Sequence, residues 1–338
     1  MAYHIALLDL RNGQAAGEKP LMLRPILFCP VLTWVCQELA ARGVERFFVV
    51  CGEEWQAEAQ QAVAAFAGAE VHSKAEITGE MLVIDHPVLP LSDCKSADGF
   101  ASFDSVEALQ AASPLWRQVQ MDRLQARGVT VIDPANTYVD PTCTVESGVT
   151  LLPGTVLRGK THIAAGCEIG PNTMIRDSSI GKGTTVNASQ VNESVIGAHT
   201  TVGPFAYVRP DCTIGDGCRV GDFVEVKNSV IGDGTKISHL TYVGDSDVGQ
   251  RVNFGCGTVT TNFDGHKKYR CTIGDDVFLG CNTNLIAPVT LGNGSYTAAG
   301  STITTDVPAD ALAIARVRQS NKPGWAAWFR RGWKKEES

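Results

Sequence analysis

The chain has 338 residues, of which 44% are hydrophobic and 19% charged, and its formal net charge is −7. This composition is typical of a folded, turn-rich protein, and the length is sufficient for two domains. A negative net charge provides no general attraction for nucleic acid or anionic lipid, so a phosphate-bearing ligand would need locally placed cations. We therefore expect neither a nucleic-acid partner nor a membrane partner.

No stretch approaches the roughly 20 apolar residues that a membrane span needs, and the N-terminus lacks the pattern of a signal peptide, so we expect a cytoplasmic protein. The eleven cysteines include no CxxC pair, and their odd number argues against a disulfide framework. Cys212 and Cys218 are six residues apart, which is the period of the repeat described below, so we interpret them as equivalent repeat positions and predict no metal site.

Residues 1–103 predict a small α/β domain. Short apolar runs at 5–8, 47–51 and 82–84 indicate buried strands of a parallel sheet. Between the first two runs, Pro30 is placed to start a helix and Gly43 to follow its end. The apolar face of this helix would be Val31, Leu32, Val35, Cys36 and Leu39.

Residues 104–130 predict a linker helix, which Pro114 either breaks or starts anew. Its apolar positions would be Val106, Leu109, Trp116, Val119 and Leu124.

From about residue 130 a period of six replaces the helical period. A repeat this short is one flat strand and one turn, and stacking such repeats buries an aliphatic column on each face. The spacing predicts a parallel β-helix from about residue 142 to 306. The recurring aliphatic positions are Val145, Leu151, Leu157, Ile163, Ile169 and Ile175, then Val202, Val208, Ile214, Val220 and Val226, and finally Ile273, Leu279, Leu285 and Leu291.

Residues 255–272 interrupt this register and predict a loop expelled from the β-helix. The loop carries His266, Lys267, Lys268 and Arg270 in an otherwise acidic protein. These residues are either a binding cluster for an anion or an ordinary solvated group of charges.

The segments VGPFAYVRPDCTIG, VGDFVEVKNS, SHLTYVGD, VNFGCGTVTTNFDG and IGDDVFLGCNTNLIAPV resemble the bifunctional UDP-N-acetylglucosamine pyrophosphorylase/glucosamine-1-phosphate N-acetyltransferase family over about residues 125–325. The resemblance implies a left-handed β-helix at 131–318, a homotrimer with sites between neighbours, and a tail at 319–338 that packs over a neighbour. A frayed tail is as compatible with the sequence. The implied activity is acetyl-CoA-dependent N-acetylation of glucosamine 1-phosphate, for UDP-N-acetylglucosamine and cell-envelope precursor synthesis.

The resemblance also implies roles for single residues. His239 would be the general base, since imidazole titrates near working pH. Arg209, Lys227 and Lys268 would bind the sugar phosphate, while Tyr242 and Asn253 would orient the sugar. Contacts to acetyl-CoA are implied for Asn262, Ala299 and Arg316, with Cys256, Phe263 and Cys281 nearby.

Three of these positions depart from the family pattern. Cys281 replaces a Ser, Phe263 a Tyr and Cys256 an Ala. A thiol at 281 raises the alternative of an acyl-enzyme, but a thiol needs a base or a positive neighbour to become a nucleophile, and the sequence shows neither. We therefore favour direct transfer.

The first domain resembles a shortened nucleotidyltransferase domain. Its segment IALLDLRNGQAAGEKPLMLRP has two separated glycines, Gly13 and Gly17, where the family has a Gly-rich phosphate loop. Arg11 and Lys19 remain. We predict no uridylyl transfer.

Three alternatives stay open. A zinc carbonic anhydrase would need clustered histidines, but His199, His239 and His266 are scattered along the chain. A non-catalytic regulatory or scaffold subunit can have the same domain layout. The same chemistry could also act on another amino sugar, because a base and a phosphate cluster do not define the sugar.

Overall fold

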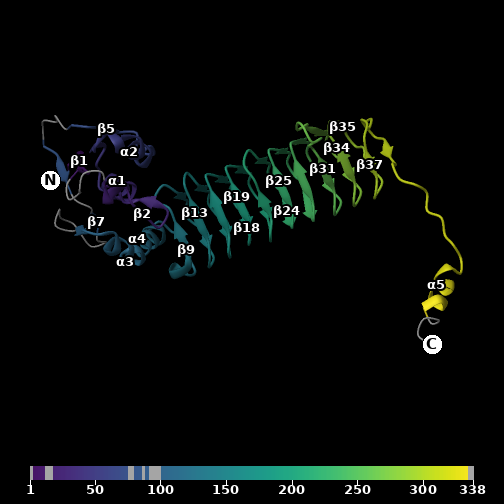
Figure 1. The fold of residues 1–338 in the computed structure, drawn as a ribbon, viewed down its shortest axis with the longest axis horizontal. Coiled ribbons are helices and arrows are strands. Elements are labelled where there is room, and N and C mark those ends of the chain that lie inside the picture. The colour runs from purple at the N-terminus through teal and green to yellow at the C-terminus, as the bar shows by residue number, and fades with distance from the viewer. Residues whose placement is uncertain (1–2, 12–17, 75–79, 86–87, 91–99, 334–338) are drawn as a thin grey trace.

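The computed structural model describes residues 3–11, 18–74, 80–85, 88–90 and 100–333. An α/β unit at the N-terminus is followed by two linker helices, a long β-helix and an extended tail (Figure 1). Among the described helices, none combines the length and apolar character that a membrane crossing needs.

The α/β unit contains a four-stranded parallel sheet in the order β5-β4-β1-β6. The sequence predicts a parallel sheet and three of these strands, β1, β4 and β6. Its helix α1 begins directly after Pro30 and ends before Gly43, whose φ of +94° favours glycine. The elements of this unit are β1 (Ile5–Asp9), β2 (Pro25–Ile26), β3 (Cys29–Pro30), α1 (Val31–Ala41), β4 (Arg46–Val50), α2 (Gln56–Val63), β5 (Ala69–His72), β6 (Leu82–Ile84), β7 (Val88–Pro90) and β8 (Phe100–Ser102).

The linker consists of two helices, α3 (Val106–Ala111) and α4 (Ser113–Ala126), because Pro114 starts a new helix in its first turn. Trp116 packs on Trp34 of α1, with ring centroids 5.2 Å apart. Met121 and Leu124, further along α4, belong to the core of the β-helix. Helix α4 therefore joins the two hydrophobic cores.

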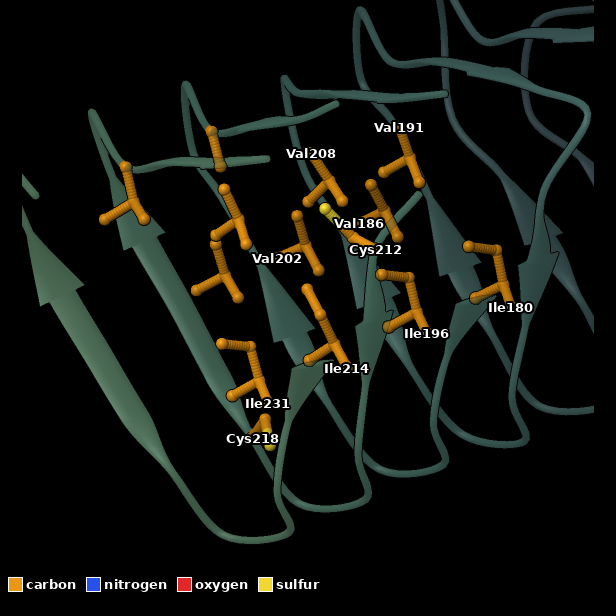
Figure 2. Close-up of a cluster of buried hydrophobic side chains, with 14 of the residues drawn as sticks. Ile180, Val186, Val191, Ile196, Val202, Val208, Cys212, Ile214, Cys218 and Ile231 are labelled. Carbon is orange, nitrogen blue, oxygen red and sulfur yellow. The ribbon is translucent and has the colours of Figure 1, made fainter. Parts of the chain in front are cut away.

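The β-helix has three parallel sheets of ten, nine and eleven strands, and each strand pairs with the strand one coil later. It begins at β9 (Thr130–Val131) and ends at β38 (Leu312–Ala313). Inward-facing Val and Ile residues stack in columns, including Ile180, Ile196, Ile214 and Ile231 in the nine-stranded sheet (Figure 2). The predicted left-handed β-helix is confirmed.

Two ranges that the six-residue spacing predicts for the β-helix are wrong. The helix extends beyond residues 142–306 at both ends. The predicted interruption at 255–272 also includes a regular strand, β31 (Val259–Thr261). Its inward position is held by Thr260, whose hydroxyl accepts a hydrogen bond from Gly244 N at 2.7 Å. Because this inward residue is polar, the six-residue aliphatic pattern does not indicate the strand. The loop that leaves the β-helix comprises only residues 262–270.

The tail leads away from the last coil and ends in helix α5 (Trp325–Trp333) (Figure 1). Its aromatic side chains are exposed: Trp325, Trp328 and Phe329 are 50%, 64% and 43% accessible. The described tail is therefore a helix that does not pack on its own β-helix.

Candidate functional site

His239 and Asp222 form a hydrogen-bonded pair at a corner of the β-helix. Asp222 ends β24 (Arg219–Asp222), His239 ends β27 (Lys236–His239), and the two residues are in register. The distance between His239 Nδ1 and Asp222 Oδ1 is 2.5 Å. The hydrogen bond from His239 lowers the pKa of Asp222, so the carboxylate is ionised and can only accept. Nδ1 therefore donates, and in the neutral imidazole Nε2 keeps its lone pair.

Asp222 is the residue of this pair that the sequence analysis missed. It lies in the quoted segment VGDFVEVKNS, 17 residues before His239. One coil of this part of the β-helix has about that length, so a comparison of residues one coil apart would have identified it.

A column of predicted co-substrate residues continues from His239 along the same corner. Cys256, Cys281 and Ala299 each lie two residues after an inward residue of the eleven-stranded sheet, as His239 does. We call His239, Cys256, Cys281 and Ala299 the corner column.

Adjacent coils of the corner column are joined through the backbone. Asn282 N donates to Cys256 O at 2.8 Å, and Gly300 N donates to Cys281 O at 2.8 Å. Arg316 passes beside Gly300, its Cδ 3.8 Å from the position that a Cβ on that glycine would take. Cys281 is exposed and Cys256 is half-buried.

The opposite edge of the ten-stranded sheet carries a cationic group around Asp245. Lys227, at the end of β25 (Glu225–Lys227), donates from Nζ to both Asp245 carboxylate oxygens at 3.1 and 3.3 Å. Asn228 donates to the same carboxylate at 2.5 Å, and Asn262 donates to it as well. Burial acts against the charge, but these three hydrogen bonds lower the pKa of Asp245. Asp245 is a second site residue that the sequence analysis missed.

Asp245 keeps Lys227 charged at this edge. Although burial opposes the charge, the hydrogen bond to Asp245 raises the pKa of Lys227. Lys268, from the expelled loop, lies close to the Lys227 side chain. We call Lys227, Asp245, Asn262 and Lys268 the Lys227 edge.

Tyr242 lies between the corner column and the Lys227 edge. It begins β28 (Tyr242–Gly244), immediately after the corner residues Leu240 and Thr241. Its hydroxyl occupies the space beside Gly244, 2.3 Å from where a Cβ on that glycine would stand. Asn262 Nδ2 lies 3.5 Å from the same hydroxyl.

Arg209 and Asn253 lie on different sheets. Arg209 Nη1 donates to Glu225 Oε1 at 2.8 Å. Glu225 belongs to the ten-stranded sheet and is in register with Tyr242 of the next coil. Asn253 begins β30 (Asn253–Phe254) on the eleven-stranded sheet, in register with Lys236 of the strand that carries His239.

The expelled loop is a short hairpin that is held by hydrogen bonds within the loop. Asp264 accepts hydrogen bonds from the backbone of His266 and Lys267, both at 2.8 Å, and Phe263 bridges to Lys268. Arg270 is paired with Asp247 and donates to backbone carbonyls, so it is not a free cation.

The predicted co-substrate residues divide into two groups. Cys256, Cys281, Ala299 and Arg316 lie along the corner, whereas Asn262 belongs to the Lys227 edge. Phe263, which follows Asn262, is exposed beside it. The three histidines of the carbonic anhydrase alternative do not cluster: the described part of the chain holds no group of three or more His, Cys, Asp or Glu placed to bind a metal.

Comparison with known proteins defines first a class and then a family. The family model "Bacterial transferase hexapeptide (six repeats)" matches residues 193–228 and 270–305. The repeats and the three-sided helix thus define a hexapeptide-repeat protein.

Two relatives are named "Bifunctional protein GlmU". The protein of Clostridium acetobutylicum is 55% identical over 198 residues, which cover 59% of this chain and 43% of the relative. The protein of Brevibacillus brevis is 46% identical over 233 residues, which cover 69% of this chain and 50% of the relative. The chain spans about half the length of these relatives. The predicted kinship with the bifunctional GlmU family is confirmed for its C-terminal part.

Among solved structures, an Arabidopsis UDP-N-acetylglucosamine acyltransferase is 14% identical and covers 61% of this chain and 76% of its own. Its TM-score is 0.34, which adds no evidence on function.

Proposed function

We propose that this chain transfers the acetyl group of acetyl-CoA to the amine of glucosamine 1-phosphate, giving N-acetylglucosamine 1-phosphate. The observation that carries the proposal is the orientation of His239, which keeps Nε2 available through its bond to Asp222. The His239 imidazole is half-exposed, with the corner column on one side and Tyr242 on the other. Kinship with the GlmU family supports the choice of reaction.

His239 would act as the general base. The amine nitrogen attacks the thioester carbonyl carbon, and His239 Nε2 takes a proton from that nitrogen. The carbon–sulfur bond then breaks, and CoA leaves as a thiolate that receives the proton from the imidazolium. Asp222 would hold the imidazole in this tautomer and stabilise the imidazolium while it exists.

The Lys227 edge would bind the sugar phosphate. Lys227 and Lys268 place two positive charges together on a chain with a net charge of −7. Asp245 fixes the position of Lys227 but leaves one ammonium hydrogen for a phosphate oxygen. Arg209 would add a third cation, and Tyr242 and Asn253 would contact the sugar.

The corner column would take the acetyl-CoA, with Arg316 meeting a CoA phosphate. Asn262 and Phe263 would contribute from the other edge. Cys281 is exposed, but the described residues give its thiol no hydrogen bond to a basic group, which supports direct transfer over an acyl-enzyme.

We propose a homotrimer because an apolar strip is exposed on the same corner. Phe205, Phe223 and Leu240 are 60%, 59% and 57% accessible, and the two phenyl rings stack with centroids 5.5 Å apart. Such a strip beside a polar site is typical of a protein interface. Neighbouring copies would cover it, so that each site lies between two β-helices, and helix α5 would extend over a neighbour.

We further propose that the α/β unit has no uridylyltransferase activity. The segment at 12–17, with both glycines of the remaining phosphate loop, lies outside the described residues. The test is incubation with UTP, Mg²⁺ and N-acetylglucosamine 1-phosphate. Pyrophosphate release at an enzymatic rate would overturn this proposal.

A panel of acceptors tests the main proposal. CoA release would be measured with glucosamine 1-phosphate, glucosamine 6-phosphate and a nucleotide-linked amino sugar. The highest kcat/KM is expected for glucosamine 1-phosphate. A higher value for another amine would replace the substrate, and no release with any of them would favour the scaffold alternative.

A further inference from the structure

A cleft of about 430 Å³ lies between the α/β unit and the first coils of the β-helix. Cys29 and Pro30 of β3 and Ala62 of α2 line one wall, and Asp140 and Arg158 belong to the other. This volume is within the range of about 300–1,000 Å³ that is usual for small-molecule sites. The cleft is separate from the corner column and the Lys227 edge, none of whose residues line it.

The cleft concentrates buried polar atoms that have no partner. Among the described residues, seven buried side-chain nitrogen or oxygen atoms lack a hydrogen bond. Three of the seven belong to residues that line this cleft: Arg158 Nε, Arg176 Nε and Asp140 Oδ1. Buried donors and acceptors are rarely left unpaired in a folded protein, so this coincidence points to a ligand.

The two arginines also place like charges side by side. Arg158 of β13 (Val156–Arg158) and Arg176 of β16 (Met174–Arg176) are in register on adjacent strands, whose backbones run about 4.8 Å apart. Arg176 is paired with Glu193 at 2.7 Å and lies 4.0 Å from Asp177. Arg158 has no carboxylate within ion-pair distance among the described residues, and its guanidinium lies over the Phe28 ring at 4.5 Å. An anion at this place would give Arg158 a counter-charge and would add a second anionic partner to Glu193 for Arg176.

Asp140 fits an anionic ligand because of its surroundings. It is 3% exposed, its Oδ2 accepts from Gly159 N at 2.8 Å, and the Cys29 thiol lies beside it. Burial raises the pKa of Asp140, which favours the neutral acid. A neutral carboxyl group repels an anion less and can donate a hydrogen bond to it.

We propose that this cleft binds a small ligand through a phosphoryl group. The phosphoryl oxygens would accept hydrogen bonds from Arg158 and Arg176, and exposed Lys160 at the rim would add a third cation. The remainder of the ligand would lie against Phe28, Pro30 and Ala62. Because the cleft has walls from both parts of the chain, the ligand would hold the α/β unit against the β-helix.

The test is isothermal titration at fixed ionic strength with inorganic phosphate, glucosamine 1-phosphate and uridine diphosphate. These three probes distinguish a free anion, a sugar phosphate and a nucleotide as the source of the phosphoryl group. The variants are Arg158→Gln and Arg176→Gln, and the control is Arg251→Gln. Arg251 forms an exposed ion pair with Asp276, and neither of these two residues lines the cleft. Lys227→Ala removes binding at the proposed acceptor site and leaves the cleft intact.

At least one probe is expected to bind the wild type and the Lys227→Ala and Arg251→Gln variants alike, and to bind Arg158→Gln and Arg176→Gln about tenfold more weakly. Acetyl transfer by the two cleft variants should be unchanged. Binding of all three probes that is independent of both arginines would overturn the proposal. Crystals of the wild type soaked in tungstate provide a second measurement, which needs no variant: anomalous density between the two guanidinium groups supports the site, and its absence there contradicts it.

Discussion

The imidazole of His239 and the carboxylate of Asp222, 17 residues apart in the sequence, are joined by a 2.5 Å hydrogen bond across two coils of the β-helix. We predict that Asp222→Ala lowers kcat about tenfold with little change in KM, while His239→Ala lowers kcat by about a hundredfold or more. Nitrogen-15 NMR of His239 should show the proton on Nδ1 in the wild type and a mixture of tautomers in Asp222→Ala. The same tautomer in both proteins would mean that Asp222 does not position the base.

Lys227→Ala should act on binding of the acceptor rather than on the chemical step. Loss of one charged hydrogen bond to the phosphate should raise KM for glucosamine 1-phosphate by about tenfold to a hundredfold. The KM for acetyl-CoA should stay the same. Arg251→Ala is the matched control, since it removes a cation from an exposed ion pair elsewhere on the β-helix. Equal effects of the two substitutions would exclude a specific phosphate contact.

Gly244→Ala should displace Tyr242 without straining the backbone. The new methyl group would stand 2.3 Å from the Tyr242 hydroxyl, so the ring has to move away from Asn262. We expect an increase of about tenfold in KM for the acceptor, with a thermal midpoint close to that of the wild type. Unchanged kinetics in a folded variant would show that Tyr242 is not a substrate contact.

Cysteine reactivity should follow burial. Burial raises the pKa of the thiols of Cys36 and Cys143, and it raises that of Cys271 to about 11, so these should react only on unfolding. Among the cysteines in the described part of the chain, exposed Cys281 should react first with a thiol reagent, as mapped by mass spectrometry. Acetyl-CoA should slow this reaction because it would cover the corner column. Equal labelling of Cys281 with and without acetyl-CoA would argue against that binding site.

The apolar strip should determine the oligomeric state. Phe205→Asp places a charge in the proposed interface, and we expect the mass in solution to fall from three chains toward one chain of 36.1 kDa. Acetyl transfer should fall with it, while circular dichroism stays the same because Phe205 lies outside the core. A monomeric wild type that transfers acetyl groups would contradict a site shared between copies.

The sequence predicts the β-helix well because its core uses one aliphatic residue per strand at a fixed spacing. It fails at Thr260, where a hydrogen-bonded hydroxyl replaces the aliphatic group and the strand is interpreted as part of the loop. Asp222 and Asp245 were missed because their partners come from an adjacent coil, and a single sequence does not display that stacking directly. Arg158 and Arg176 meet the α/β unit only in the folded chain, so no local pattern marks their cleft.

The most direct test of the proposed function is identification of the product by NMR. The wild type, with glucosamine 1-phosphate and acetyl-CoA labelled with carbon-13 at its carbonyl, should form the amide of N-acetylglucosamine 1-phosphate and release one CoA per amide. The His239→Ala variant should form this amide at least about a hundredfold more slowly. Absence of the labelled amide with folded, trimeric wild type, or an unchanged rate in His239→Ala, would contradict the proposed reaction or the role of its base.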